Sequence, residues 1–170
     1  MGSEYFKIGK FVSVFSLSGE LILQHSLGKK TSLKGIEALF IEDAGDSFLP
    51  YFVSSARIKS DAEIYIQLEQ INTRESARKF VQKEVWLSSE DFKKFAAKSA
   101  PISFLGYQII DGSKNIGTII EVIEMPHQVL CKINMEGEEK LIPLHEQTLE
   151  RIDNKTKKIY VTLPDGLLEL

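Results

Sequence analysis

The stretch Tyr5-Phe6-Lys7-Ile8-Gly9-Lys10-Phe11-Val12-Ser13-Val14 has an alternating pattern of apolar side chains. The apolar side chains at its even positions are Phe6, Ile8, Val12 and Val14. Successive side chains of a β-strand point to opposite faces, so a period of two gives one apolar face. The pattern therefore predicts a strand over residues 5–14 that buries one face in a core.

The same kind of signal recurs along the chain. Short apolar runs bounded by turn residues predict strands at 20–23, 38–42, 51–59, 64–68, 84–87, 108–110, 115–123, 129–133, 139–142 and 157–162. Gly117 inside one of these runs indicates a bulge or corner, and Glu136-Gly137 indicates a turn. Many short strands separated by turns are typical of small barrels, which close to avoid exposed sheet edges.

One helix is expected in the first half, over residues 73–82. Asn72 is a suitable N-cap, with Glu75 as its capping-box partner. Ala77, Phe80 and Val81 would form its apolar face.

A polar segment interrupts the strand series around residues 88–101 and ends in Pro101, which disfavours helix at the residue before it. We place the domain boundary there. The expected organisation is mainly β, with a small β-barrel domain at 1–90, a short linker at 91–102 and a second small β-barrel domain at 103–170.

Composition excludes several classes of protein. The chain is 43% hydrophobic and 26% charged, which is typical of a folded domain and not of a disordered one. We see neither a secretion signal nor a membrane-spanning stretch, and the single Cys131 excludes an internal disulfide, so a cytoplasmic protein is expected.

Charge is distributed unevenly between the halves. Residues 1–95 carry 13 basic and 13 acidic residues, whereas residues 96–170 carry 8 and 11. Phosphate would therefore be repelled by the second half, which suits a basic protein partner, while only the first half has basic clusters suited to RNA. DNA and membranes are not expected as partners, and a monomer is the default.

No catalytic, metal-binding or cofactor-binding pattern is visible. His25, His127 and His145 lie far apart and in no ligand spacing, and the glycines fit neither a P-loop nor a dinucleotide fingerprint. Cys131 lies in an alternating apolar run, where burial would raise the pKa of its thiol and make it a core residue and not a nucleophile. The expectation is a binding protein and not an enzyme.

The basic clusters are candidates for RNA contact, although a solvated protein face is the simpler interpretation of each. The rRNA-contact candidates are Lys10, Lys29, Lys30, Lys34, Arg74 and Arg78. Lys79 and Lys83 form a further pair spaced four apart on the predicted helix.

Several short motifs together resemble the RimM family of ribosome maturation factors. In chain order they are Ile8-Gly9-Lys10, Leu17-Ser18-Gly19-Glu20, Arg74-Glu75-Ser76-Ala77, Leu105-Gly106, Ile116-Gly117-Thr118-Ile119, Val129-Leu130, Ile142-Pro143 and Pro164-Asp165-Gly166-Leu167-Leu168. The chain differs from the family where Phe15-Ser16 replaces a His-Gly pair, and where Ala100-Pro101-Ile102-Ser103 replaces paired aromatic residues.

The resemblance implies a translation-factor-like barrel followed by a PRC barrel, in a factor that binds the head of the immature small ribosomal subunit. It further implies association with small-subunit ribosomal protein nineteen and support of 16S rRNA processing. The candidates for contacting or shaping the protein-partner surface are Leu105, Gly106, Pro143, Leu167, Glu136, Glu138 and Glu139. The alternative is a non-catalytic PRC- or SH3-like adaptor for a non-ribosomal protein.

Overall fold

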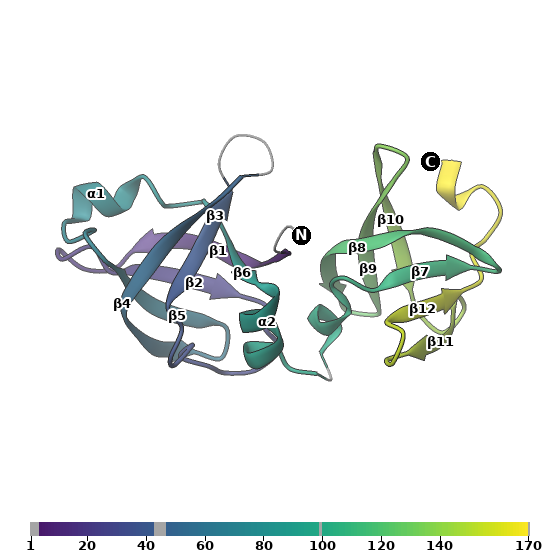
Figure 1. Cartoon of the computed structure of the whole chain (residues 1–170), viewed down its shortest axis with the longest axis horizontal. Helices are drawn as coiled ribbons and strands as arrows, with labels where there is room; N and C mark the ends of the chain where they lie inside the picture. Colours follow the sequence, from purple (N-terminus) through teal and green to yellow (C-terminus); the bar gives the residue numbers. More distant parts are fainter. Residues whose placement is uncertain (1–3, 43–46, 99, 170) are drawn as a thin grey trace. The chain divides into compact units, whose positions relative to one another are not determined.

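The computed structural model describes residues 4–42, 47–98 and 100–169, and the chain divides after residue 100 into two units. Both units are built mainly from β-strands, as Figure 1 shows. The expected mainly β architecture with two domains is confirmed. The division itself differs from the expected linker at 91–102, because residues 91–100 belong to the first unit.

Six antiparallel strands of the first unit form a closed barrel in the order β1-β2-β5-β4-β3-β6. Their bounds are β1 Tyr5–Val14, β2 Leu21–His25, β3 Ala38–Glu42, β4 Phe48–Ser60, β5 Glu63–Leu68 and β6 Glu84–Ser88. Closure follows from β1, which pairs with β2 on one side and with β6 on the other.

Strand β1 matches its expected bounds, but its side chains do not keep one phase. Ile8 and Phe11 are fully buried, whereas Val12 is only half-buried. The register of β1 shifts between Lys7 and Gly9 against β6, and between Phe11 and Ser13 against β2. Each bulge adds a residue on β1, so the inward position switches between even and odd numbers at each one, and Ile8 and Phe11 can both point inward.

Two short helices pack at opposite ends of this barrel, α1 Arg74–Arg78 and α2 Ser89–Phe95 (Figure 1). The N-cap of α1 is Thr73 and not Asn72, and Ser76 in place of Glu75 completes the capping box. The helix is also shorter than expected. Its continuation is replaced by turns, because the Gln82 and Lys83 backbones hydrogen-bond to Phe11 of β1.

Helix α2 occupies residues that the sequence pattern assigned to the linker. Ser88 caps it by accepting a hydrogen bond from the Asp91 backbone, and Phe92 is buried against Phe6 of β1. The Ala97 N–H donates to the Leu27 carbonyl, so this segment is attached to the first barrel.

The second unit holds six strands in the order β10-β9-β8-β7-β12-β11, after a 3-10 helix at Pro101–Phe104. Their bounds are β7 Gln108–Asp111, β8 Lys114–Met125, β9 Gln128–Met135, β10 Glu138–Leu144, β11 Leu149–Asp153 and β12 Lys158–Val161. All neighbours are antiparallel except β7 and β12, which run parallel. Strand β11 was not expected from the sequence, and a second 3-10 helix follows at Leu167–Glu169.

The core of this unit is a layer of β-branched side chains and one thiol. Ile109, Cys131, Ile133, Ile142 and Ile159 are fully buried. The predicted turn at Glu136-Gly137 is confirmed: both residues have positive φ, as a two-residue hairpin of type I′ requires. The predicted bulge near Gly117 is also confirmed by the register shift between Ile109 and Ile110.

Candidate binding surfaces

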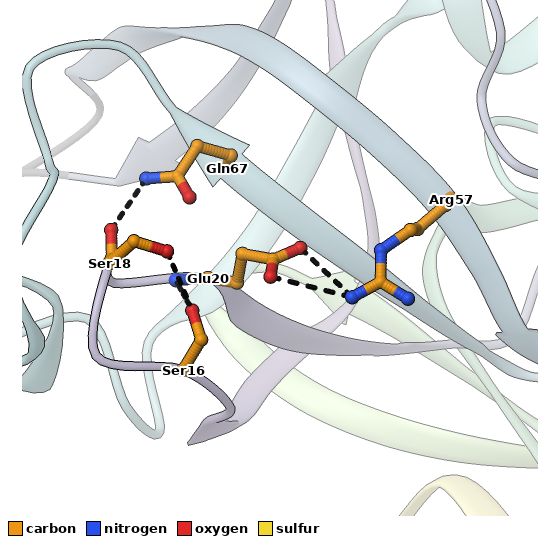
Figure 2. Close-up of polar contacts among 5 residues, drawn as sticks. All are labelled: Ser16, Ser18, Glu20, Arg57 and Gln67. Atoms are coloured by element: carbon orange, nitrogen blue, oxygen red, sulfur yellow. Dashed lines mark hydrogen bonds and ion pairs between the residues drawn. The ribbon is translucent and has the colours of Figure 1, made fainter.

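The turn at residues 15–20 joins β1 to β2. It is held by hydrogen bonds within its own backbone and by contacts with Gln67, Arg74 and Arg57. Within it, the Phe15 N–H donates to the Glu20 carbonyl at 2.7 Å, and Ser16 Oγ accepts from the Glu20 N–H at 3.2 Å. Gln67 Nε2 donates to the Ser18 carbonyl at 2.9 Å (Figure 2). We call this segment the 15–20 turn.

Glycine is required in this turn. Gly19 has φ +87°, and a side chain there would meet the Thr73 carbonyl oxygen at 2.7 Å. The Arg74 N–H also donates to the Leu17 carbonyl at 3.1 Å, so the turn lies against the start of α1. Leu17 itself is 81% exposed. An apolar side chain is thus held in solvent on a backbone that has little freedom.

Glu20 connects the turn to the neighbouring strand β4. Its carboxylate oxygens lie 3.3 and 3.4 Å from the Arg57 guanidinium (Figure 2). That guanidinium lies 4.1 Å from the Tyr65 ring centroid and 5.6 Å from that of Phe15. The two rings are 4.4 Å apart. We call Phe15, Arg57 and Tyr65 the aromatic–arginine cluster.

Arg74 and Arg78, two of the rRNA-contact candidates, lie on α1 beside the 15–20 turn. Arg78 is exposed, and Arg74 is half-buried with its Nε lacking a hydrogen-bond partner among the described residues. Neither makes an ion pair with any described residue. The structure therefore places one exposed cation, Arg78, and one half-buried cation, Arg74, on the helix that contacts the 15–20 turn.

The other lysine candidates lie elsewhere on the first unit. Lys29 and Lys30 are exposed in the loop after β2, where Gly28 approaches Ala97 behind α2, and Lys30 lies 3.9 Å from Asp61. Lys34 is exposed in the same loop. Lys10 is exposed on β1 and donates to Gln82 Oε1 at 3.2 Å. The six candidates thus occupy at least two separate places and do not form one patch.

Lys79 and Lys83 line a cavity of about 290 Å³ beside α1. Tyr51, Phe80 and Glu42 also line it. The Glu42 carboxylate offsets part of the lysine charge.

In the second unit, the acidic candidates lie on the β9–β10 hairpin. Glu136, Glu138 and Glu139 are all exposed. Glu138 lies 3.2 Å from Lys140, and Glu139 lies 3.5 Å from Lys132. A hydrogen bond to Glu121 raises the pKa of Lys132, which keeps that amine charged between the two carboxylates. Glu136 makes no ion pair with a described residue.

The apolar candidates of this unit have different positions. Leu105 is buried, and Gly106 has φ +86° and donates its N–H to the Ile119 carbonyl. These two residues shape the fold. Leu167 is half-buried in the last 3-10 helix, and Pro143 is half-buried on β10.

Pro143 belongs to an apolar surface that no sequence motif reveals. It pairs with Leu130, which pairs with Ile123, so these three side chains form one row across β10, β9 and β8. In the next row on the same face, Leu141 pairs with Lys132 and is 47% exposed. We call Ile123, Leu130, Pro143, Leu141 and Lys132 the β8–β10 outer face. Its most distinctive feature is the exposure of Leu141, which the sequence pattern does not predict.

His25 and Cys131 are buried, one in each unit, whereas His127 is exposed and His145 is half-buried. His25 is buried with its Nδ1 accepting from the Leu27 N–H, and burial lowers its pKa. Cys131 is fully buried in the other unit, where burial raises the pKa of its thiol to about 12. No cluster of three metal-ligating side chains occurs among residues 4–42, 47–98 and 100–169. No helix in those ranges has the length and apolar character to cross a membrane.

Comparison with known proteins covers nearly the whole chain. Residues 6–92 match the family described as the RimM N-terminal domain, and residues 101–167 match the RimM PRC barrel domain. A Parabacteroides distasonis protein named ribosome maturation factor RimM is 35% identical over 171 residues, which cover 98% of this chain and 97% of that protein.

Two further relatives carry the same name or a related one. The ribosome maturation factor RimM of Christiangramia forsetii is 27% identical over 169 residues, covering 98% of this chain and 96% of its own. A crystal structure of a Pseudomonas aeruginosa protein, described as the 16S ribosomal RNA processing protein RimM, is 19% identical with a TM-score of 0.43. It covers 95% of this chain and 98% of its own.

Proposed function

This chain belongs to the RimM family of ribosome maturation factors, and from that premise we propose that it binds the head of the immature small ribosomal subunit and supports 16S rRNA processing. Its protein partner in this proposal is small-subunit ribosomal protein nineteen. Such assembly takes place in the cytoplasm. No reaction is assigned to the chain, because the name of its relatives describes a maturation factor.

The observation that supports the protein contact is the β8–β10 outer face. Its apolar row of Ile123, Leu130 and Pro143 continues to Leu141, which is 47% exposed, while Lys132 lies opposite Leu141 on the same face. Exposed carboxylates of the β9–β10 hairpin lie at its border. An apolar centre with a charged border is the usual anatomy of a protein interface, and the acidic border suits a basic ribosomal protein.

RNA contact is assigned to the first unit. Its exposed basic candidates are Lys10, Lys29, Lys30, Lys34 and Arg78, together with the half-buried Arg74. Contacts between these cations and phosphates would release counterions, so binding should weaken steeply as salt is raised.

Binding alone is sufficient to support maturation. A factor that binds the near-native arrangement of rRNA and protein more tightly than other arrangements shifts the population toward it. Each unit would supply one half of that recognition, since one binds protein and the other binds RNA.

The testing experiment is co-sedimentation of the purified protein with immature and with mature small subunits, at low and at moderate salt. Selective sedimentation with immature particles supports the proposal. Absence of binding to either particle by folded protein would refute it and leave the adaptor for a non-ribosomal protein as the alternative.

Charge reversal tests the acidic border. Glu136→Lys with Glu139→Lys should slow association with ribosomal protein nineteen, because opposite charges steer the encounter. The matched control is Glu146→Lys with Asp165→Lys, which changes the same unit by the same charge at exposed positions outside the hairpin. Equal association rates for the two double variants would remove the hairpin from the mechanism.

A further inference from the structure

We propose that the aromatic–arginine cluster of Phe15, Arg57 and Tyr65 is a stacking site for an unpaired RNA base. This inference rests on the proposed RNA-binding role of the first unit and specifies which of its surfaces binds and which form of RNA it takes.

The cluster combines side chains of three segments on the outside of the barrel. Arg57 of β4 and Tyr65 of β5 are direct cross-strand partners, and Phe15 packs on Tyr65 from the 15–20 turn. Phe15 is 45% exposed, the Arg57 side chain is 56% exposed, and Tyr65 is half-buried beneath them. Partly exposed rings and a guanidinium plane thus lie together on one surface.

The cluster is ordered before any ligand arrives. Glu20, whose side chain is only 19% exposed, holds the guanidinium over Tyr65. The Phe15 backbone is fixed by its hydrogen bond to the Glu20 carbonyl. A ligand that stacks here therefore does not bear the entropy cost of ordering these side chains.

The chemistry favours a base over a phosphate. Glu20 offsets the charge of Arg57, so the site is a weak attractor of anions, while Phe15 and Arg57 remain partly exposed. Unpaired bases stack on aromatic rings and on arginine planes, whereas the bases of a duplex have their faces covered by their neighbours. The cluster is accordingly suited to single-stranded RNA.

Phosphate contacts come from the adjacent helix. The Arg74 backbone is bonded to Leu17 of the 15–20 turn, and Arg78 follows one helical turn later without an ion-pair partner among the described residues. A strand whose base stacks on the cluster has cations beside it for its backbone. Among the described residues, no comparable combination of planar groups and exposed cations surrounds Lys29 and Lys30, of which Lys30 lies near Asp61.

The test measures binding of the full-length protein to a fluorescently labelled ten-nucleotide RNA, alone and annealed to its complement, by anisotropy. Base stacking on an aromatic side chain contributes about 1–3 kcal/mol, so Phe15→Ser should weaken single-strand binding roughly 5- to 150-fold. Phe15→Trp should preserve it. The matched control is Phe52→Ser, which removes a ring of similar exposure, 51%, from another part of β4.

Arg57→Lys separates stacking from charge. It keeps the positive charge but removes the plane, so it should also weaken single-strand binding, whereas a purely electrostatic contact would be unaffected. Thermal unfolding of each variant shows whether the barrel is intact.

Three results would overturn the inference: equal binding by Phe15→Ser and Phe52→Ser, unchanged binding by Arg57→Lys, or a preference of the native protein for duplex. If immature subunits still bind in those cases, only the stacking site fails and the proposed function stands. If Phe15→Ser loses subunit binding but keeps RNA binding, the turn contacts protein and the inference is again wrong.

Discussion

The thiol of Cys131 should be almost unreactive in the folded protein and should report on the unfolding of the second unit. Burial raises the pKa of this thiol from 9.0 to about 12. Only the thiolate attacks a disulfide reagent. At pH 8 this pKa change lowers the thiolate fraction about a thousandfold relative to the unfolded chain. The complete burial of Cys131 lowers reagent access further.

The assay follows labelling by an aromatic disulfide reagent at pH 8, with and without urea. Because Cys131 is the only cysteine, the signal comes from one position. We expect labelling in seconds to minutes in urea and at least a thousandfold slower in native buffer. Rapid labelling of the native protein would show an accessible, ionised thiol and would refute the assignment of Cys131 to the core.

The same pKa change has a consequence for stability. Above pH 9 the unfolded chain loses the thiol proton while the folded chain keeps it, so ionisation favours unfolding. The contribution is fully present below pH 9 and is lost as pH rises toward 12, with about 1.4 kcal/mol lost by pH 10. Cys131→Ala should remove this part of the pH dependence of the urea midpoint, although it lowers stability overall.

Three further predictions concern the first unit. Burial lowers the pKa of His25 below 6.5, so the stability that this residue contributes is present above pH 6.5 and is lost as pH falls. The urea midpoints at pH 7 and pH 5 should therefore differ less in His25→Asn than in the native protein. An unchanged difference would exclude His25 as the cause. Gly9→Ala should lower the free energy of unfolding by about 3 kcal/mol, because the added Cβ would collide with the Gln24 carbonyl oxygen. Gly35→Ala, at φ +88° in open space, should lower it by only about 1 kcal/mol. Thermal unfolding that ranks the two variants in the opposite order would contradict this. Thr73→Ala removes the N-cap of α1 and should cost about 1 kcal/mol in urea unfolding, while Asn72→Ala should have little effect.

The strands were predictable because their alternation is a local property. Strand β3 has its expected bounds, and β5, β6 and β7 differ from theirs by one residue. Strand β11 was missed because its sequence, Leu149-Glu150-Arg151-Ile152-Asp153, is mostly charged; it is an edge strand, which one neighbour suffices to hold.

Long-range pairing explains the other differences. The helix expected at 73–82 ends at Arg78 because the following backbone pairs with Phe11, a partner that no local pattern reveals. The segment around residues 88–101 was predicted to be a linker, with a short helical turn left open, because it is polar, lacks a strand period and ends in Pro101. Residues 89–95 become a helix because Phe6 of β1 covers the Phe92 ring.

The candidate surfaces were predictable by residue type but not by grouping. The basic residues of the first unit were identified, yet the sequence did not show that Arg74 lies beside the 15–20 turn while Lys30 lies beside Asp61. Tyr65 lies in a predicted strand, and Phe15 stood out only as part of the Phe15-Ser16 pair that replaces a His-Gly pair of the family. Only the barrel register brings Arg57 opposite Tyr65 and near the turn.

The strand order of the second unit also has a consequence for how this chain folds during its own synthesis. Strands β8, β9 and β10 are consecutive in sequence and pair as two hairpins, so little chain entropy is lost when they form. The parallel ladder between β7 and β12 joins Gln108 to Lys158, so it cannot form before residue 158 has been synthesised. Leu141 can therefore take its place in the β9–β10 hairpin before that ladder forms, and we expect the long-range pairing to be slower than the hairpins.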